Sequence, residues 1–335
     1  MSTGTILLAR LDSMGDVVMS GPAVRAAART AERVVLLVGP RGEAVARLLP
    51  GVDQVLVWRS PWIDPNPPRT EREDVMNLVG RVTGLGVDEA LILTSFHQSP
   101  LPLALLLRMA GVARVCAISE DYPGSLLDLR HRVAPGIPEP ERALSLVEAA
   151  GHRLAPHDDG GLTLTDSLPD TFELTGGDGH VVVHVGADAP SRELPVALGA
   201  DVTASLSARG HRVVVTGEDQ VKADKVASGH ALNLAGRTDT AELADVLRRA
   251  RVLIVGNTGP AHLAAAVRTP VVSLFAPVVP ASAWAPYGIA CRVLGDQDAP
   301  CAGTRARECP VPGHPCLNDV TTEDVLTAIE ELEDT

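Results

Sequence analysis

Short apolar runs alternate with longer amphipathic stretches along almost the whole chain. Each run predicts a buried strand, and the stretch that follows it has the spacing of a helix. The predicted strands are 4–9, 33–38, 54–58, 89–93, 114–118, 180–185, 212–216, 252–255 and 271–275. The predicted helices are 16–30, 41–49, 71–84, 100–110, 142–150, 195–209, 240–249, 260–267 and 320–333. Strands that alternate with helices indicate an α/β protein whose parallel sheets are covered on both faces.

The alternation stops between about His152 and Gly179, where Gly, Asp, Pro and Thr predominate, and then starts again. We therefore predict two domains, residues 1–155 and 179–335, joined by a linker over 156–178. The final helix is a candidate to pack back on the first domain. Ligands of doubly wound sheets bind outside the carboxyl ends of the strands. We expect the functional residues in the loops at those ends, facing a cleft between the two halves.

Composition narrows the function. The 335-residue chain is 45% apolar but only 2% aromatic, which suits parallel sheets built from Val, Leu, Ile and Ala. Its formal net charge of −13 argues against nucleic-acid binding, which needs a basic surface. The apolar run at the N-terminus, 6–9, is too short for a secretory signal, and no segment approaches the ~20 residues that span a bilayer. We therefore expect a cytoplasmic protein.

A polar turn follows the eighth predicted strand and leads into an Ala-rich helix. The backbone amides of Thr258, Gly259 and Ala261, together with the helix dipole, predict an anion site there. The alternative is an ordinary helix start with Asn257 or Thr258 as the N-cap. His262, on the first helical turn, either contacts the ligand and orders the turn or is a core or capping histidine.

A second glycine-containing loop follows strand 180–185 and carries Arg192. A guanidinium in that position can pair with two phosphate oxygens at once. The alternative is an arginine on the solvated surface. An acidic protein that binds an anion needs such local positive charge, which favours a ligand-binding role for Arg192.

The loop after the first strand runs from Arg10 to Gly15 and places Asp16 at a helix start. Asp16 is a candidate general base that takes a proton from an attacking hydroxyl. The alternative is a first-turn carboxylate that satisfies free amides. Asp12 either orients Asp16, caps the loop or pairs with Arg10.

The loop after strand 89–93 offers weaker candidates for contacts to a second substrate. His97 and Gln98 lie there, directly after the strand end. The neighbouring Ser99 is equally well explained as a helix start.

These loops resemble glycosyltransferase family 9, the ADP-heptose heptosyltransferases. RLDSMGDVVMSGPAVRAA is similar to the family's R-x-D-x-x-G-D…P opening, and VHVGADAPSRELP to its Gly-Ala loop with a basic residue. VGNTGPAHLAAAVRTPVVSLFAPVVPASAWAPYG is similar to its D-[ST]-G-x-x-H-x-A-A-A…L-F-G-P-T…W-x-P segment. PEPERALSLVEAAG and the late C…C…C…L segment are also family-like. The order and spacing of these motifs cover nearly the whole chain.

The resemblance implies a GT-B fold, with two Rossmann-like domains and the active site between them. It implies inverting transfer that needs neither a metal nor another cofactor. Asp16 would deprotonate the acceptor hydroxyl, while Arg192 and the turn from Thr258 to His262 would stabilise the departing diphosphate. The partners would be a nucleotide sugar, ADP-heptose first, and a hydroxyl on a surface glycan or a secondary-metabolite precursor. Peripheral contact with a membrane is compatible with this role.

The sequence departs from the family pattern at three places. Asn257 stands where the family has Asp, Arg192 where Lys is usual, and Ala276-Pro277-Val278 where the family has Gly-Pro-Thr. These departures bear on the donor more than on the fold. They leave open a catalytically silent nucleotide-sugar-binding protein. A sugar-nucleotide epimerase of the same fold is a further alternative, but it needs no second substrate and no motif around Asp16.

Four of the five cysteines lie late in the chain, at Cys291, Cys301, Cys309 and Cys316, and Cys116 stands apart. None of the spacings is the CxxC that is typical of zinc sites. A disulfide framework does not fit a cytoplasmic protein. The pattern favours reduced, structural thiols over a structural metal site or a redox role.

Overall fold

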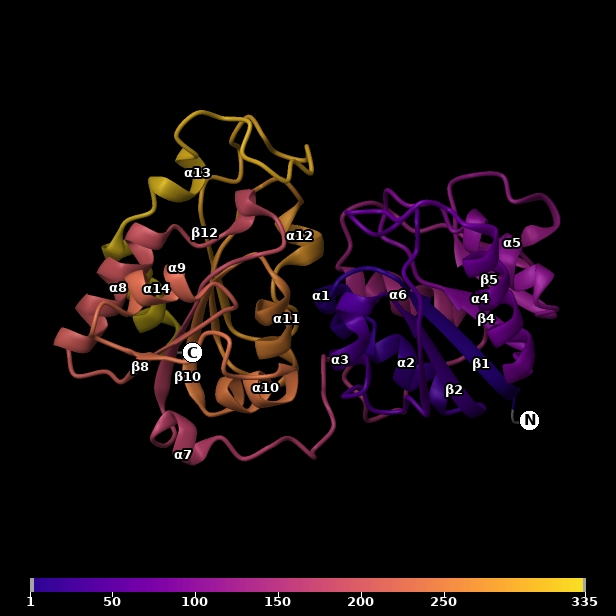
Figure 1. Ribbon diagram of the computed structural model, residues 1–335, viewed down its shortest axis with the longest axis horizontal. Coiled ribbons are helices and arrows are strands. Elements are labelled where there is room, and N and C mark those ends of the chain that lie inside the picture. The colour runs from indigo at the N-terminus through magenta and orange to yellow at the C-terminus, as the bar shows by residue number, and fades with distance from the viewer. Residues whose placement is uncertain (1–2, 334–335) are drawn as a thin grey trace. The chain divides into compact units, whose positions relative to one another are not determined.

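The computed structural model describes residues 3–333, which fold as two compact units (Figure 1). The N-terminal unit ends at Thr165 and the C-terminal unit begins at Asp166. Each unit has its own hydrophobic core and its own six-stranded parallel sheet.

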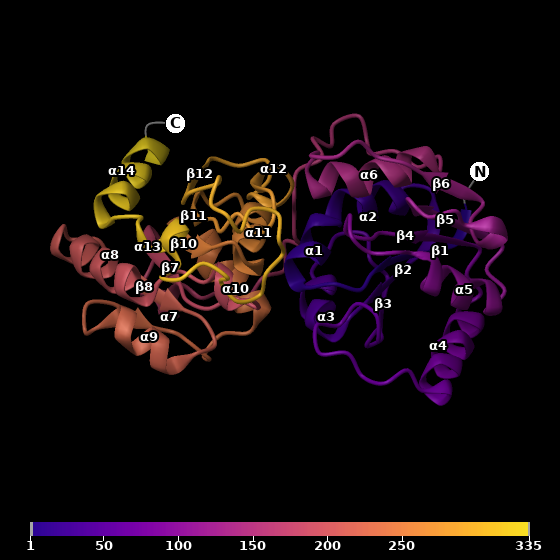
Figure 2. The same ribbon diagram turned by 90° about the horizontal axis from the view of Figure 1, so that it is seen from above.

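The sheet of the N-terminal unit has the order β3-β2-β1-β4-β5-β6. Its strands are β1 (Thr3–Arg10), β2 (Ala31–Val38), β3 (Gln54–Val57), β4 (Glu89–Ile92), β5 (Arg114–Ile118) and β6 (Leu129–His131). Its helices are α1 (Met14–Met19), α2 (Gly21–Ala28), α3 (Glu43–Ala46), α4 (Arg72–Leu85), α5 (Leu101–Met109) and α6 (Glu139–Ala149), with 3₁₀ turns η1 (Pro40–Gly42) and η2 (Gly124–Leu126). Helices α4 and α5 cover one face of the sheet, and α2 and α6 pack together on the other (Figure 2).

The sheet of the C-terminal unit has the order β12-β11-β10-β7-β8-β9. Its strands are β7 (His180–His184), β8 (Val213–Thr216), β9 (Leu232–Asn233), β10 (Ala250–Gly256), β11 (Val271–Leu274) and β12 (Cys291–Leu294). Its helices are α7 (Phe172–Thr175), α8 (Val196–Ala208), α9 (Gln220–Ala227), α10 (Thr240–Arg248), α11 (Gly259–Ala266), α12 (Ala281–Trp284), α13 (Pro315–Asn318) and α14 (Thr322–Glu333), with the 3₁₀ turn η3 (Pro190–Arg192). Helices α8, α9 and α14 bury their apolar sides in one core, so the final helix packs against α8 and β12 of its own unit.

Both sheets have the strand order of a Rossmann fold, and all their strands run parallel. The order reverses between β1 and β4 in the first sheet and between β7 and β10 in the second. In sheets of this kind the crevice at the reversal, outside the carboxyl ends of the strands, is the place where ligands bind. The loops after β1, β4, β7 and β10 are therefore the positions at which functional side chains should gather.

The structure adds elements that the sequence pattern did not predict. The strands β6, β9 and β12 are short edge strands, and their residues are mostly half-buried or exposed. An edge strand packs less of its surface than a central strand, so its sequence lacks a continuous apolar run. The short helices α7, α9, α12 and α13 were also missed, and the predicted helix 16–30 is divided into α1 and α2 at Ser20.

The segment predicted as a linker is held by an arginine of each unit. Arg25 of α2 donates to both carboxylate oxygens of Asp158 at 2.7 and 2.8 Å, which fixes the first part to the N-terminal unit. Arg249, directly after α10, pairs with Asp170 and Asp178, both at 2.8 Å, which fixes the last part to the C-terminal unit. Within residues 3–333, every helix is too short or too polar to cross a membrane.

Candidate functional site

A buried arginine gathers three carboxylates at the strand reversal of the N-terminal unit. Arg10 is the last residue of β1, and only 2% of its side chain is exposed. Its Nη2 lies 2.9 Å from Asp16 Oδ1 and 3.1 Å from Glu139 Oε2, and its Nε lies 3.0 Å from Asp12 Oδ2. We call these four residues the Arg10 cluster. One guanidinium thus holds acids from the loop after β1, from the first turn of α1 and from the start of α6.

The Arg10 cluster places three carboxylates around one buried arginine, and burial disfavours their charged forms. Burial raises the pKa of Asp12 to about 6, because the repulsion of Asp16 adds to burial and the attraction of Arg10 offsets only part of them. Burial also raises the pKa of Glu139, although Arg10 and Arg142 oppose the shift. Arg142 Nε lies 3.6 Å from Glu139 Oε1 and supplies the second positive charge. The cluster can therefore take up a proton at a pH only slightly below neutral.

Asp16 is the most exposed acid of the Arg10 cluster. Its side chain is 16% exposed, against 11% for Asp12 and 2% for Glu139. Its Oδ2 accepts hydrogen bonds from Ser13 Oγ at 2.7 Å and from Ser13 N at 3.3 Å. Asp16 thus satisfies a backbone amide at the start of α1, as the alternative interpretation expected, and it is also oriented by Arg10. The first-turn interpretation is therefore confirmed, and the role of Asp16 as a general base stays a prediction.

The loop after β4 brings Gln98 to the Arg10 cluster. Gln98 Nε2 donates to Asp12 Oδ1, and Gln98 Oε1 accepts from Ser95 N at 3.1 Å. Ser95 Oγ in turn accepts from Arg10 at 2.9 Å. His97 is exposed and packs edge-on against the ring of the preceding phenylalanine, and Gly15 is buried inside α1. The structure thus joins Gln98 to the acids and places His97 at the surface.

Sequence reasoning missed Glu139, Arg142 and Ser95. Glu139 contacts Arg10 across 129 positions of the chain, so no local spacing points to it. At the start of α6 it resembles an ordinary first-turn acid, which is favourable at a helix N-terminus. The one available signal was the segment PEPER before an apolar helix, which carries two acids and an arginine.

In the C-terminal unit, Arg192 lies beside the turn that follows β10. The η3 turn ends at Arg192, and the strand that precedes it, β7, pairs with β10. The backbone of the two loops is in direct contact, because a Cβ atom added at Gly256 would overlap the carbonyl oxygen of Arg192. Only glycine fits at that point. The two loops predicted to bind phosphate therefore meet at the strand reversal.

The turn before α11 has fewer free backbone N–H groups than the sequence predicted. Thr258 N donates to Gly256 O at 2.9 Å, and Ala261 N donates to Thr258 O at 3.0 Å. The prediction of three free amides was therefore wrong for these two. Within residues 3–333, the N–H of Gly259 has no acceptor. Gly259 is the first residue of α11, where the helix dipole also favours an anion.

Asn257 and His262 are both buried in this region. Asn257 Oδ1 accepts from Ala276 N at 3.3 Å, and Asn257 Nδ2 donates to Ala276 O at 3.4 Å. The side-chain amide thus ties the loop after β10 to the end of β11, which an aspartate could do only in part because it has no donor. His262 is 6% exposed on the first turn of α11.

A neighbouring histidine escaped the prediction of site residues. His184 ends β7, is 9% exposed, and its Nδ1 lies 2.9 Å from Thr216 Oγ1 at the end of β8. Burial lowers the pKa of His184 to about 4. This imidazole is therefore neutral at pH 7 and adds no positive charge to the strand ends of the C-terminal unit.

All five cysteines are free thiols. Burial raises the pKa of Cys116 and Cys291 to about 12. Burial, together with the neighbouring thiols of Cys301 and Cys309, raises the pKa of Cys316 to about 11. In the part of the chain that the structure describes, no three His, Cys, Asp or Glu side chains are arranged to hold a metal ion.

Comparison with known proteins finds similarity to glycosyltransferases of family 9. Lipopolysaccharide heptosyltransferase 3 of Escherichia coli is 38% identical over 79 residues, which span 21% of this chain and 23% of that protein. The structure of a glycosyltransferase of family 9 from Veillonella parvula has a TM-score of 0.78 at 17% identity and covers 99% of this chain and 97% of its own. The E. coli ADP-heptose lps heptosyltransferase II has a TM-score of 0.75 at 19% identity, with 99% and 100% covered.

The solved structures confirm the predicted GT-B fold class, with two Rossmann-like parallel sheets. The family model of glycosyltransferase family 9 (heptosyltransferase) matches residues 105–314, which is more than half of the chain and includes the loops of the C-terminal unit. The curated relative aligns with less than a quarter of its own length. The match to the family model shows that this chain belongs to glycosyltransferase family 9.

Proposed function

We propose that this protein is an inverting, metal-independent glycosyltransferase that moves a heptose from ADP-heptose to an acceptor hydroxyl. The observation that carries the proposal is the placement of Asp16. It is the most exposed acid of the Arg10 cluster and lies at the strand reversal of its unit. An oriented carboxylate at such a position suits a general base.

The proposed reaction uses one carboxylate and a set of positive groups. Asp16 takes the proton of the acceptor hydroxyl while the hydroxyl oxygen bonds to the anomeric carbon. The bond from that carbon to the donor's phosphate oxygen breaks, and its electron pair leaves with ADP. Attack opposite the leaving group inverts the anomeric centre. The proton ends on Asp16, and ADP carries the new negative charge.

The C-terminal unit supports the second half of this reaction. The Arg192 guanidinium can pair with two phosphate oxygens, and the Gly259 N–H at the start of α11 can donate to a third. Positive groups of this kind stabilise a departing diphosphate as its charge develops. They perform the task for which other transferases use a divalent cation, so the mechanism that we propose requires no metal.

ADP-heptose is the proposed donor because the E. coli protein with 99% coverage of this chain is named an ADP-heptose heptosyltransferase. The acceptor that we propose carries a free hydroxyl, as a surface glycan or a secondary-metabolite precursor does. Asn257 favours a second candidate, a protein that binds the nucleotide sugar without turnover. Its amide is engaged by Ala276, and the family's carboxylate is missing.

A transfer assay separates the two candidates. The purified protein is incubated with ADP-heptose and a panel of hydroxyl-bearing glycosides, and ADP release and product are followed together. We expect product with inverted anomeric configuration, and a loss of about 10²- to 10⁴-fold in Asp16→Asn with unchanged ADP affinity. Asp64→Asn, an acid of the same unit that binds Arg59, is the control. Undiminished transfer by Asp16→Asn removes Asp16 from the mechanism, and donor binding without any product supports the silent protein.

A further inference from the structure

An apolar pocket opens at the strand reversal of the N-terminal unit, next to the Arg10 cluster. It is lined from β1, β4, the loops after β1, β3 and β4, and the first turn of α5. It holds about 260 Å³, including space open to solvent. Its lining residues are Ala9, Leu11, Trp62, Ile63, Ile92, Leu93, Thr94, Gln98, Ser99, Pro100 and Leu103. We call it the Trp62 pocket. Its position is the one at which Rossmann-like sheets bind ligands.

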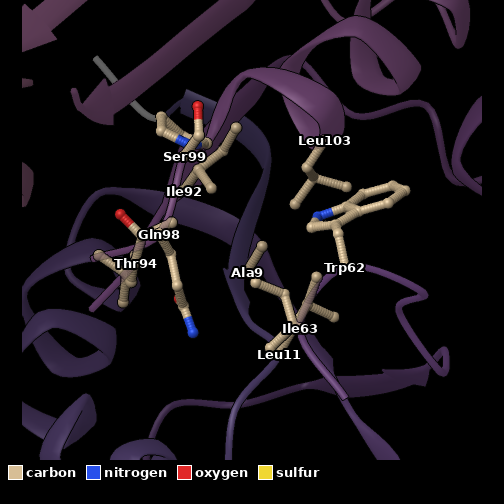
Figure 3. A pocket seen from close by; sticks show the side chains of 11 residues that line it. Ala9, Leu11, Trp62, Ile63, Ile92, Thr94, Gln98, Ser99 and Leu103 are labelled. Atoms are coloured by element: carbon tan, nitrogen blue, oxygen red, sulfur yellow. The ribbon is translucent and has the colours of Figure 1, made fainter. Parts of the chain in front are cut away.

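The aromatic residue that lines the pocket, Trp62, is held in place by a second tryptophan, Trp58. Trp62 packs edge-on against Trp58, with 5.2 Å between the ring centroids and 62° between the planes. Trp58 is buried and donates from Nε1 to Asp74 Oδ2 at 2.8 Å. Figure 3 shows Trp62 beside Leu103 on one side of the pocket, with Thr94 and Gln98 on the opposite side. A ring held in this way offers a preformed surface for stacking.

The pocket has polar groups but no charge. None of its lining side chains is ionisable, so the phosphate or carboxylate of a ligand would find no compensating cation among them. Thr94 is 6% exposed, and within residues 3–333 its Oγ1 has no hydrogen-bond partner. Buried hydroxyls are normally paired. An uncharged ligand oxygen would satisfy this one.

One residue connects the pocket to the proposed base. Gln98 lines the pocket and donates to Asp12, which pairs with Arg10. Arg10 in turn holds Asp16 at 2.9 Å. The pocket and the proposed base therefore belong to one hydrogen-bonded region at the same end of the sheet.

We propose that the Trp62 pocket binds an uncharged, ring-bearing group of the acceptor, so that the acceptor is an aryl or other cyclic hydrophobic glycoside rather than a phosphorylated glycan. The identity of this ligand as the acceptor rests on the proposed function. The ring would pack against Trp62 and Leu103, and its glycosidic oxygen would accept a hydrogen bond from Thr94 on the opposite side.

Calorimetry on the full chain with three probes tests this proposal. We expect phenyl β-glucoside to bind at least ~10-fold more tightly than methyl β-glucoside, because only the first has a ring to bury. Glucose 6-phosphate should not bind measurably. Equal affinity for the two glucosides, or tighter binding of glucose 6-phosphate, would overturn the proposal.

Substitutions in the Trp62 pocket test whether phenyl β-glucoside binds there. Trp62→Ala should lower the affinity for phenyl β-glucoside by at least ~10-fold. Thr94→Val, which removes only a hydroxyl, should lower it by about 2- to 10-fold. Leu105→Ala, on the exposed side of the same helix as Leu103, is the matched control and should leave the affinity unchanged. Unchanged affinity in both pocket variants would refute the assignment.

ADP binding, measured on the same samples, separates this inference from the proposed function. If ADP binds while phenyl β-glucoside does not, the pocket assignment fails and the transferase proposal stands. If phenyl β-glucoside binds in the pocket while no nucleotide binds, the transferase proposal fails and the pocket remains a binding site for uncharged rings.

Discussion

Replacing Arg10 by methionine removes the guanidinium that three acids share. Arg10 and Glu139 are each only 2% exposed, so the remaining carboxylates cannot regain full hydration. Removing one partner of a buried ion pair costs about 3–5 kcal/mol. For a unit of this size, roughly 2–4 °C is lost per kcal/mol, so Tm of the N-terminal unit should fall by roughly 6–20 °C at pH 8.

The loss should depend on pH in a defined direction. Even with Arg10 present, the pKa of Asp12 is raised to about 6, and removing Arg10 takes away the attraction that lowers it. A buried acid whose folded pKa lies above its unfolded pKa contributes stability at low pH, and that stability is lost as the pH rises through the folded pKa. The deficit of Arg10→Met relative to the wild type should therefore be small at pH 5 and grow towards pH 8.

Thermal unfolding followed by tryptophan fluorescence measures this effect, because Trp58 and Trp62 both report on the N-terminal unit. Arg47→Met is the matched control, since Arg47 pairs with Glu43 at the surface, with side chains 59% and 42% exposed. Such a pair contributes at most about 0.5 kcal/mol. Equal losses of Tm in Arg10→Met at pH 5 and pH 8, or a loss no larger than that of Arg47→Met, would refute the electrostatic account of the Arg10 cluster.

Three further predictions concern the C-terminal unit and the thiols. Gly256→Ala should destabilise the protein by about 1–3 kcal/mol and weaken ADP binding, because the added Cβ overlaps the Arg192 carbonyl oxygen. Gly80→Ala, which adds a Cβ in open space on α4, is the control and should be neutral or stabilising. Urea unfolding measures the stability of both variants, and calorimetry measures their ADP affinity. Asn257→Asp should cost about 1–3 kcal/mol at pH 7 in urea unfolding, since it cannot donate to Ala276 O, and an unchanged midpoint would count against the structural role of this amide. Cys116, Cys291 and Cys316, with raised pKa values, should react slowly with Ellman's reagent at pH 8 and fully in denaturant, and fast labelling of these three would contradict the burial argument.

The central elements of the fold were predictable because their signal is local. Buried parallel strands such as β1, β2 and β7 are continuous apolar runs, and their helices follow at regular distances. The edge strands β6, β9 and β12 were missed because they pack less of their surface than central strands do. The loops at the strand ends could also be predicted, since sheet topology brings them together wherever strands run parallel.

The partners within the Arg10 cluster could be predicted only in part. Arg10, Asp12 and Asp16 lie close together in the sequence, from the end of β1 to the first turn of α1, so their proximity follows from spacing. Glu139 joins them only through the packing of α6. The predicted number of free backbone N–H groups before α11 was wrong for a similar reason. A tight turn lets the N–H groups of Thr258 and Ala261 donate to nearby carbonyls, and the identity of the residues does not encode that geometry.

The central claim is that the loops of the C-terminal unit bind the diphosphate of an ADP-sugar. Calorimetric titration of ADP, UDP and GDP into the wild type, Arg192→Ala and Asp16→Asn tests it most directly. We predict selective binding of ADP, weakened about 10- to 100-fold in Arg192→Ala because a charge-assisted pair is lost, and unchanged in Asp16→Asn. Binding of no nucleotide by the wild type, or full ADP affinity in Arg192→Ala, would contradict the account.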